Sequence, residues 1–181
     1  MSTNSNTLSV RYRSSTYKRL RHEWHEIQQS VTDDTTSNFS LEPFTEDLRK
    51  WKGNVRGPAG SAYEGGNFQY MLTVGPEYPL QAPTLRLDTK IWHPNISSEG
   101  ILEHDWGDWC PALTLEKWLV AVTALLSEPD FENGTRNEVL DQYVIDPHAF
   151  TAQAREWTQL YAIVYTGEKV GVKAEPNKDT I

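Results

Sequence analysis

Residues Asn67–Val74 read Asn-Phe-Gln-Tyr-Met-Leu-Thr-Val, and every second residue from Phe68 to Val74 is a larger apolar one. Alternation with a period of two is typical of a strand with one buried face. Leu85 and Leu87 repeat the pattern, and glycine and proline cluster between the apolar segments, at residues 57–60, 65–66 and 76–79. Because these residues favour tight turns, the stretch predicts an antiparallel meander of short strands.

Helical periodicity appears on both sides of this predicted sheet. Thr16–Gln29 carries apolar residues on one helical face, with Ser15 or Thr16 as a plausible N-cap. Beyond the sheet we expect a helix from Thr114, its cap, to Ser127, a short helix from Glu138 to Ile145, and another from Pro147. The expected inner faces are Leu20, Trp24 and Ile27; Leu115, Leu119, Val122 and Leu126; and Phe150, Ala154, Trp157 and Tyr161. The predicted class is α+β, with helices packed on one face of a sheet.

Length and composition restrict the chain to a few classes. It has 181 residues, of which 38 % are hydrophobic, enough for one packed core. We therefore expect one domain over residues 16–165, with polar tails at 1–15 and 166–181. The longest apolar run, Trp118–Leu126, is too short to span a bilayer, and no secretory signal is visible at the start, so no membrane association is expected. A single cysteine excludes an internal disulfide and favours a reducing compartment, here the cytoplasm or nucleus.

Charge is unevenly distributed. The net charge is −8, which disfavours a general nucleic-acid binder, because phosphate contacts need a basic surface. Yet the first 22 residues hold five basic residues and no acidic one, whereas Ile91–Thr135 holds eight acidic residues and one basic. These regions are either solvated faces or docking surfaces for partners of opposite charge.

Several motifs, in a fixed order, resemble those of the ubiquitin-conjugating enzymes. The matching segments are Tyr63-Glu64-Gly65-Gly66, Tyr78-Pro79, Pro83, His93-Pro94-Asn95, Trp109-x-Pro111-Ala112-Leu113-Thr114, Leu125-Leu126-Ser127-Glu128-Pro129, Ala154-Arg155-Glu156-Trp157-Thr158 and Tyr161-Ala162. The resemblance covers about residues 16–165. It implies the ubiquitin-conjugating fold: an N-terminal helix, a four-stranded antiparallel meander and C-terminal helices. It also implies an activity, the transfer of ubiquitin or a related modifier from a cysteine thioester to a target lysine.

The chain departs from the family at the nucleophile. In the family the cysteine follows the Asn of His-Pro-Asn by eight residues, and here that position is Glu103. The loop from Gly100 to Trp109 is also shorter than in the family. A carboxylate cannot form the thioester, so the resemblance identifies a divergent member that lacks the usual active-site cysteine.

Three other residues are candidates for chemistry. Cys110 stands where the family has a serine, and it is either a small structural residue or a relocated nucleophile. The resemblance assigns Asn95 to oxyanion stabilisation, although such a side chain can also simply tie a loop. It places Asp105 near the incoming lysine. No pair of His, Cys, Asp or Glu residues has a recognised metal-ligand spacing, so neither a metal nor another cofactor is expected.

The resemblance also implies two partner surfaces. Lys18, Arg19 and Arg21 are expected on the exposed side of the first helix, where the family docks its activating enzyme. A small apolar patch of Leu80, Pro111 and Ala112 is expected where the family contacts its ligases. Trp106 and Trp109, in the acidic segment 99–109, either fill the space left by the shortened loop or form a partner site.

Two functions are consistent with these residues. The first is a non-catalytic binding module that holds ubiquitin or a related modifier, a conjugating enzyme or a ligase. The second is an active conjugating enzyme that forms its thioester on Cys110. Glu103 favours the first hypothesis. The retained His93-Pro94-Asn95 supports the second, because the family's known non-catalytic variants commonly lose that motif.

Overall fold

The predicted meander is confirmed by a computed structural model, which describes residues 15–30, 38–104 and 109–163. Its four strands are β1 (Glu42–Pro43), β2 (Lys50–Arg56), β3 (Asn67–Thr73) and β4 (Thr84–Leu87). They pair antiparallel in sequence order. Tyr70, at the centre of the alternating stretch, lies opposite Gly53 on β2 and Leu87 on β4. The α+β class and the expected arrangement of the sheet are therefore correct.

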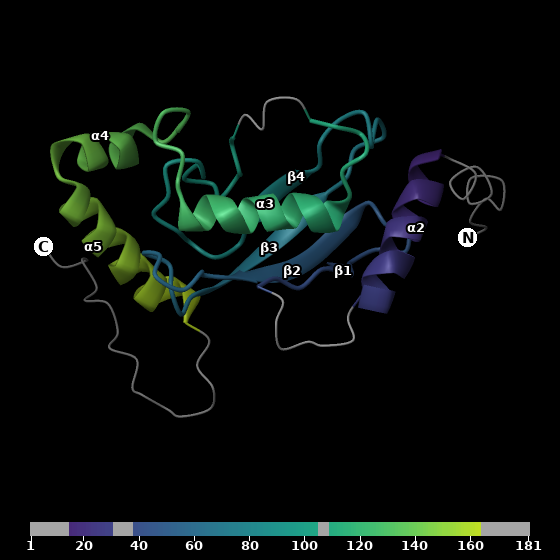
Figure 1. The fold of residues 1–181 in the computed structure, drawn as a ribbon, viewed down its shortest axis with the longest axis horizontal. Helices are drawn as coiled ribbons and strands as arrows, with labels where there is room; N and C mark the ends of the chain where they lie inside the picture. The colour runs from purple at the N-terminus through teal and green to yellow at the C-terminus, as the bar shows by residue number, and fades with distance from the viewer. Residues whose placement is uncertain (1–14, 31–37, 105–108, 164–181) are drawn as a thin grey trace, which may run out of the picture.

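Helix α3 (Leu115–Ser127) lies across the apolar face of this sheet (Figure 1). The alternating residues form that face, and those of β3 are almost completely buried. They pack with the inner residues of α3 in one core, whose sheet and α3 members are Trp51, Val55, Phe68, Tyr70, Leu72, Leu85, Leu87, Leu115, Trp118, Leu119, Val122 and Leu126. The apolar face of the sheet, which the alternation with period two predicts, thus packs against the apolar face of α3, which the period of 3.6 predicts.

The remaining helices flank this core. Figure 1 shows α2 (Ser15–Ser30) near one end of the sheet, and α4 (Asn137–Ile145) and α5 (Pro147–Trp157) near the other. The predicted cap of α3 is confirmed, because the Thr114 hydroxyl accepts the Lys117 N–H. Helix α5 begins with Pro147 in its first turn, as expected, and the Asp146 side chain caps it.

Two expectations about the helices are wrong. Thr16 does not cap α2; it lies inside the helix, and its buried hydroxyl contacts the Pro76 and Tyr78 carbonyl oxygens. Tyr161 is not on the inner face, because the chain continues from α5 as a short π-helix, η1 (Thr158–Ala162). The wider turn of a π-helix rotates the following residues, so that Tyr161 is 44 % exposed and Ala162 is buried in its place.

The predicted tails, residues 1–15 and 166–181, lie outside the described residues except for Ser15, which begins α2. Within the ranges that the structure describes, no helix is long and apolar enough to cross a membrane. Across the same ranges, no three His, Cys, Asp or Glu side chains gather closely enough to hold a metal ion.

Candidate functional site

The His93-Pro94-Asn95 turn is buried at the end of α3. The backbone N–H of Asn95 donates to His93 Nδ1, so the other ring nitrogen, Nε2, carries the proton and donates to the Leu125 carbonyl at 3.2 Å. Burial, which disfavours the charged imidazolium, lowers the pKa of His93 to about 4. His93 is therefore neutral at pH 7 and serves as a structural link between the turn and α3.

The side-chain amide of Asn95 is used at both ends. Its Nδ2 donates to the Asp130 carbonyl at 2.8 Å, and its Oδ1 accepts the Asp130 N–H at 3.0 Å. Asn95 is 0 % exposed. In this arrangement the amide ties the turn to the loop after α3, with one of its two N–H groups bonded to the backbone of that loop.

The loop that Asn95 holds is itself well ordered by hydrogen bonds. The Asp130 carboxylate accepts the backbone N–H groups of Glu132 and Asn133, and the amide of Asn133 as well. These bonds, led by the Asn133 side chain, hold the pKa of Asp130 below its usual range. His104 Nδ1 lies 3.7 Å from the same carboxylate. His104, which follows Glu103, thus lies close to this loop.

Glu103 lies beside Asn95, where the family has its cysteine. Its backbone N–H donates to the Asn95 carbonyl at 2.9 Å, which fixes the position of the residue relative to the turn. The side chain is exposed. The backbone of residue 103 is therefore held against the His-Pro-Asn turn, and the side chain at this position is a carboxylate.

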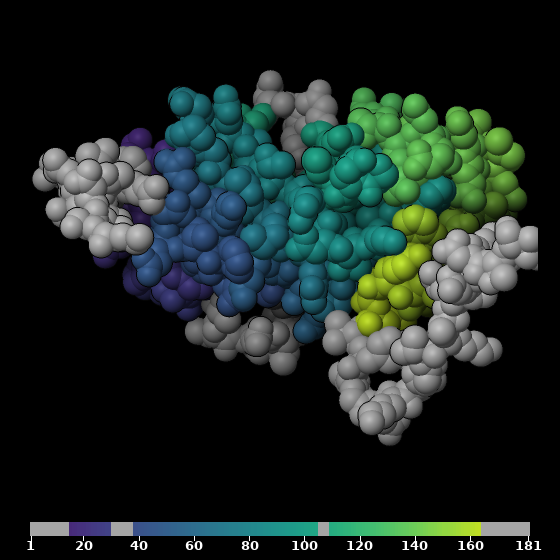
Figure 2. Space-filling view, turned by 180° about the vertical axis from the view of Figure 1, so that it is seen from behind, coloured from purple at the N-terminus to yellow at the C-terminus, as the bar shows by residue number. Residues whose placement is uncertain are grey.

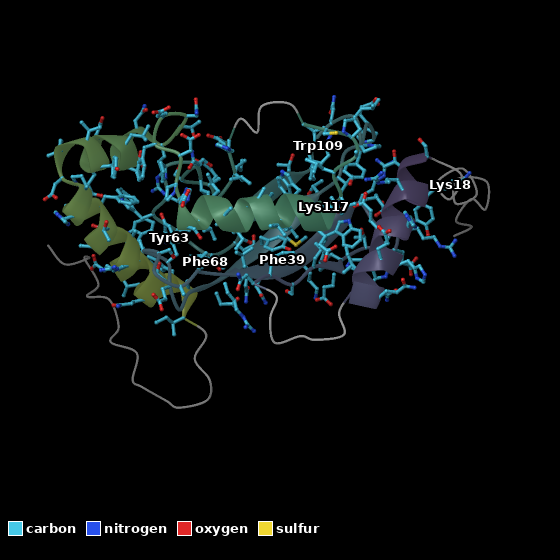
Figure 3. The ribbon with its side chains drawn as sticks, viewed as in Figure 1. Lys18, Phe39, Tyr63, Phe68, Trp109 and Lys117 are labelled. Carbon is cyan, nitrogen blue, oxygen red and sulfur yellow. The ribbon has the colours of Figure 1, made fainter. Side chains whose placement is uncertain are left out.

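Cys110 belongs to a different part of the molecule. Trp109, next to it, donates its indole N–H to the Pro79 carbonyl at 2.6 Å and packs beside Tyr78. Cys110 is exposed, and its carbonyl accepts the Leu113 N–H. Figure 3 labels Trp109 toward the α2 side, whereas Tyr63, which packs on His93, is labelled toward α5. The structure therefore does not bring Cys110 to Asn95.

The acidic tryptophan-rich segment is described only in part. Asp105 and Trp106 lie outside the described residues, so the structure does not place them. Trp109 is half-buried, and its bond to Pro79 makes it a packing residue at the end of the shortened loop. This agrees with the first of the two roles considered for the tryptophans.

The structure joins the two segments that carry the expected apolar patch. The bond from Trp109 to Pro79 brings the 109–112 segment to the turn that carries Leu80, which is 71 % exposed. Pro111 and Ala112 are exposed as well. Sequence segments about 30 residues apart thus form one exposed surface with modest apolar area.

The basic face of α2 is smaller than expected. Lys18 and Arg21 are exposed, but Arg19 is half-buried: it forms an ion pair with Glu23 and donates from Nη2 to the Leu113 carbonyl at 3.0 Å. The hydrogen bond from Arg19 to Glu23 is the largest cause of a raised Arg19 pKa. Arg19 therefore joins α2 to the 109–114 segment, and among the described Lys and Arg residues of α2 the exposed ones are Lys18 and Arg21.

Sequence reasoning missed Glu23, the acceptor at the centre of this link. Its side chain is 1 % exposed, and it accepts hydrogen bonds from Arg19, from the Tyr78 hydroxyl at 2.6 Å and from the Leu115 N–H at 2.8 Å. The i, i+4 spacing of Arg19 and Glu23 was the only signal in the sequence, and that spacing occurs on many exposed helices. Tyr78 and Leu115 could be linked to it only by the fold.

Comparisons with known proteins agree with the motifs. The family model described as ubiquitin-conjugating enzyme matches residues 19–158. Ubiquitin-conjugating enzyme E2 27 of Arabidopsis thaliana is 36 % identical over 140 residues, which are 76 % of this chain and 73 % of the relative. A crystal structure described as a ubiquitin-conjugating enzyme from Plasmodium yoelii is 32 % identical, with a TM-score of 0.74 over 83 % of this chain and 97 % of the other.

A ubiquitin-conjugating enzyme domain from Toxoplasma gondii is 34 % identical to the chain, with a TM-score of 0.70 over 80 % of this chain and 97 % of the other. Motifs, fold and sequence similarity thus coincide over most of the described residues, and the family match spans residues 19–158. The chain belongs to the ubiquitin-conjugating enzyme family.

Proposed function

We propose that this chain is a non-catalytic member of its family, a module that binds ubiquitin or a related modifier, a conjugating enzyme or a ligase. The observation that carries the proposal is Glu103, held by its N–H beside Asn95 at the position of the family's cysteine. Thioester formation requires a thiolate, and an exposed carboxylate at this position cannot supply one.

Two further features support the proposal. The Asn95 amide is bonded at both ends to the Asp130 backbone, which gives this side chain a structural role in holding the turn. Cys110 is exposed and follows Trp109, which is bonded to Pro79, whereas Asn95 of the His-Pro-Asn turn is bonded to Asp130 after α3. A nucleophile there would act without the groups that the family places around its cysteine.

The retained surfaces fit a binding role. The apolar patch of Leu80, Pro111 and Ala112 is exposed, and Lys18 and Arg21 keep a basic strip on α2. Family membership implies interaction with ubiquitin, activating enzymes and ligases in general, and these surfaces are the proposed contacts. The cytoplasm and nucleus are the proposed locations, in keeping with a single cysteine.

A charging assay tests the proposal. The chain is incubated with activating enzyme, ATP and ubiquitin and run on a non-reducing gel, beside Cys110→Ser and Glu103→Cys. We expect no thiol-sensitive band from the wild type or Cys110→Ser. A wild-type band that disappears in Cys110→Ser would overturn the proposal and establish the alternative, an active enzyme that uses Cys110.

Glu103→Cys distinguishes two reasons for an uncharged wild type, the loss of the nucleophile and the loss of the surface that binds the activating enzyme. Because the backbone of residue 103 keeps its bond to Asn95, we expect this variant to acquire a thiol-sensitive band. Absence of a band from Glu103→Cys would remove the activating enzyme from the proposed partners. Binding of ubiquitin, a conjugating enzyme or a ligase to the wild type, weakened by Leu80→Ala, would then support the remaining part.

A further inference from the structure

A groove lies between the end of β4 and α5. Its deeper part is a half-open pocket of about 330 Å³, bounded by residues 87–91, the turn Ser97–Gly100, Arg136 and Trp157. Gly100 closes that turn with a φ of +82°, and an added Cβ would meet the Leu87 carbonyl oxygen. The turn is thus set tightly against β4, and the pocket wall is part of the fold.

Arg136 forms the inner wall of this pocket. Its side chain is 8 % exposed, and its guanidinium carbon lies 4.7 Å from the Trp92 ring and 5.5 Å from the Trp157 ring. Its Nε donates to Glu138 and its Nη1 to the Ile91 carbonyl. The aromatic rings and these two bonds hold the guanidinium in place. The bonds described for Arg136 do not use Nη2, which carries two further N–H donors.

Other charged and polar groups surround the pocket. Lys90 adds a charged donor, whereas the hydroxyl groups of Ser97 and Ser98 donate to Glu99. Two carboxylates are also present: Asp88 is paired with Arg86 at 2.8 Å, and Glu99 is held at the turn. Hydrogen bonds from Ser98, from its own backbone N–H and from Ser97, together with the field of Arg136, lower the pKa of Glu99. The exposed Glu99 carboxylate thus lines the pocket as a negative charge that opposes an incoming anion.

The groove continues beyond Lys90. A second, more open pocket of about 430 Å³ shares residues 88–90 with the first and is bounded by η1 and by Ile163. Lys90 Nζ lies 5.1 Å from the Tyr161 ring, and both Tyr161 and Ile163 are nearly half-exposed. Figure 2 shows the yellow surface of η1 beside the teal surface of the β4 region. Lys90 therefore lies between the pocket of Arg136 and the partly exposed apolar residues Tyr161 and Ile163.

We propose that this groove binds an oxyanion, a carboxylate or phosphate, carried on an aromatic or apolar group, with the anion at Arg136 and Lys90 and the apolar part against Tyr161. A guanidinium with its faces covered and N–H donors to spare suits a two-oxygen anion, and charge-assisted hydrogen bonds of this kind are among the strongest. A partly enclosed pocket with few convergent polar groups is the usual form of a small-ligand site. The inference does not depend on the presence or absence of a thioester.

The test is an NMR titration of the full chain with phenyl phosphate and, separately, with benzoate, at constant ionic strength. The signals followed are the Arg136 Nε–H and the Trp157 indole N–H. We expect saturable shifts with at least one probe, and the stronger of the two identifies the anion as phosphate or carboxylate. No saturable shift with either probe, in the wild type and in Glu99→Gln, would overturn the proposal.

Variants outside the core make the test specific. Glu99→Gln removes the competing carboxylate and should tighten binding about 2- to 5-fold, whereas Lys90→Gln should weaken it by a similar factor, the range expected for one partly exposed charge pair. Lys117→Gln, at an exposed lysine of α3, is the matched control and should leave the affinity unchanged. Equal loss in Lys90→Gln and Lys117→Gln would show non-specific charge attraction and refute the site.

Discussion

Removal of the Glu23 carboxylate should destabilise the fold strongly, although Glu23 lies on a helix rich in charged residues. The group is 1 % exposed and accepts hydrogen bonds from Arg19, the Tyr78 hydroxyl and the Leu115 N–H. Glu23→Ala leaves these three donors without their acceptor, and breaking a buried charged pair costs about 3–5 kcal/mol. For a chain of this size that corresponds to a fall in Tm of about 6–20 °C.

Urea unfolding followed by tryptophan fluorescence measures the change in the free energy of unfolding. Glu23→Gln keeps one acceptor oxygen and should cost less, about 1–3 kcal/mol. Glu26→Ala is the matched control, because Glu26 is on the same helix but half-exposed beside His22, and it should change stability by less than about 0.5 kcal/mol. A Glu23→Ala protein within about 1 kcal/mol of the wild type would refute the role assigned to this network.

The other predictions concern aromatic packing, surface charge and pH. Trp157→Ala should lower the free energy of unfolding by about 2–3 kcal/mol, less than the loss for a fully packed aromatic residue, because Trp157 is half-buried against Trp92. Denaturant unfolding measures the change, and a loss under about 1 kcal/mol would contradict this packing. Replacement of Lys18 and Arg21 by Glu should leave Tm nearly unchanged and make any binding to an activating enzyme weaker and less salt-sensitive. Binding titrations at two salt concentrations measure this effect. Unchanged affinity would show that Lys18 and Arg21 do not form a docking surface. The pKa of His93 falls from 6.5 to about 4 on folding, so the unfolded chain binds more protons between these values, and stability present above pH 6.5 should decline by up to about 3 kcal/mol as the pH falls toward 4. His93→Gln should flatten that part of the stability–pH curve, and a curve of unchanged slope would show that His93 is not the group responsible.

Much of the fold could be predicted because its signals are local. The alternation from Phe68 to Val74 marks both the strand and its buried face, and Thr114 marks the start of α3 through a cap that reaches only to Lys117. The spacing from Asn95 to Glu103 likewise led to the hypothesis of a missing nucleophile, because the motif and the position that the resemblance assigns to the cysteine lie in one short segment. These features depend on contacts within a few residues, or on a backbone period that every part of an element repeats.

What only the tertiary structure decided depends on pairs of residues far apart in the chain. Arg19 belongs to a buried network because Leu113, 94 positions away, lies beside it. The Asn95 amide is committed to Asp130, 35 positions away. A sequence pattern determines which face of a helix or strand is apolar, but it does not determine which distant polar group lies opposite a given side chain. That pairing, and with it the separation of Cys110 from Asn95, depends on how the elements pack around the core.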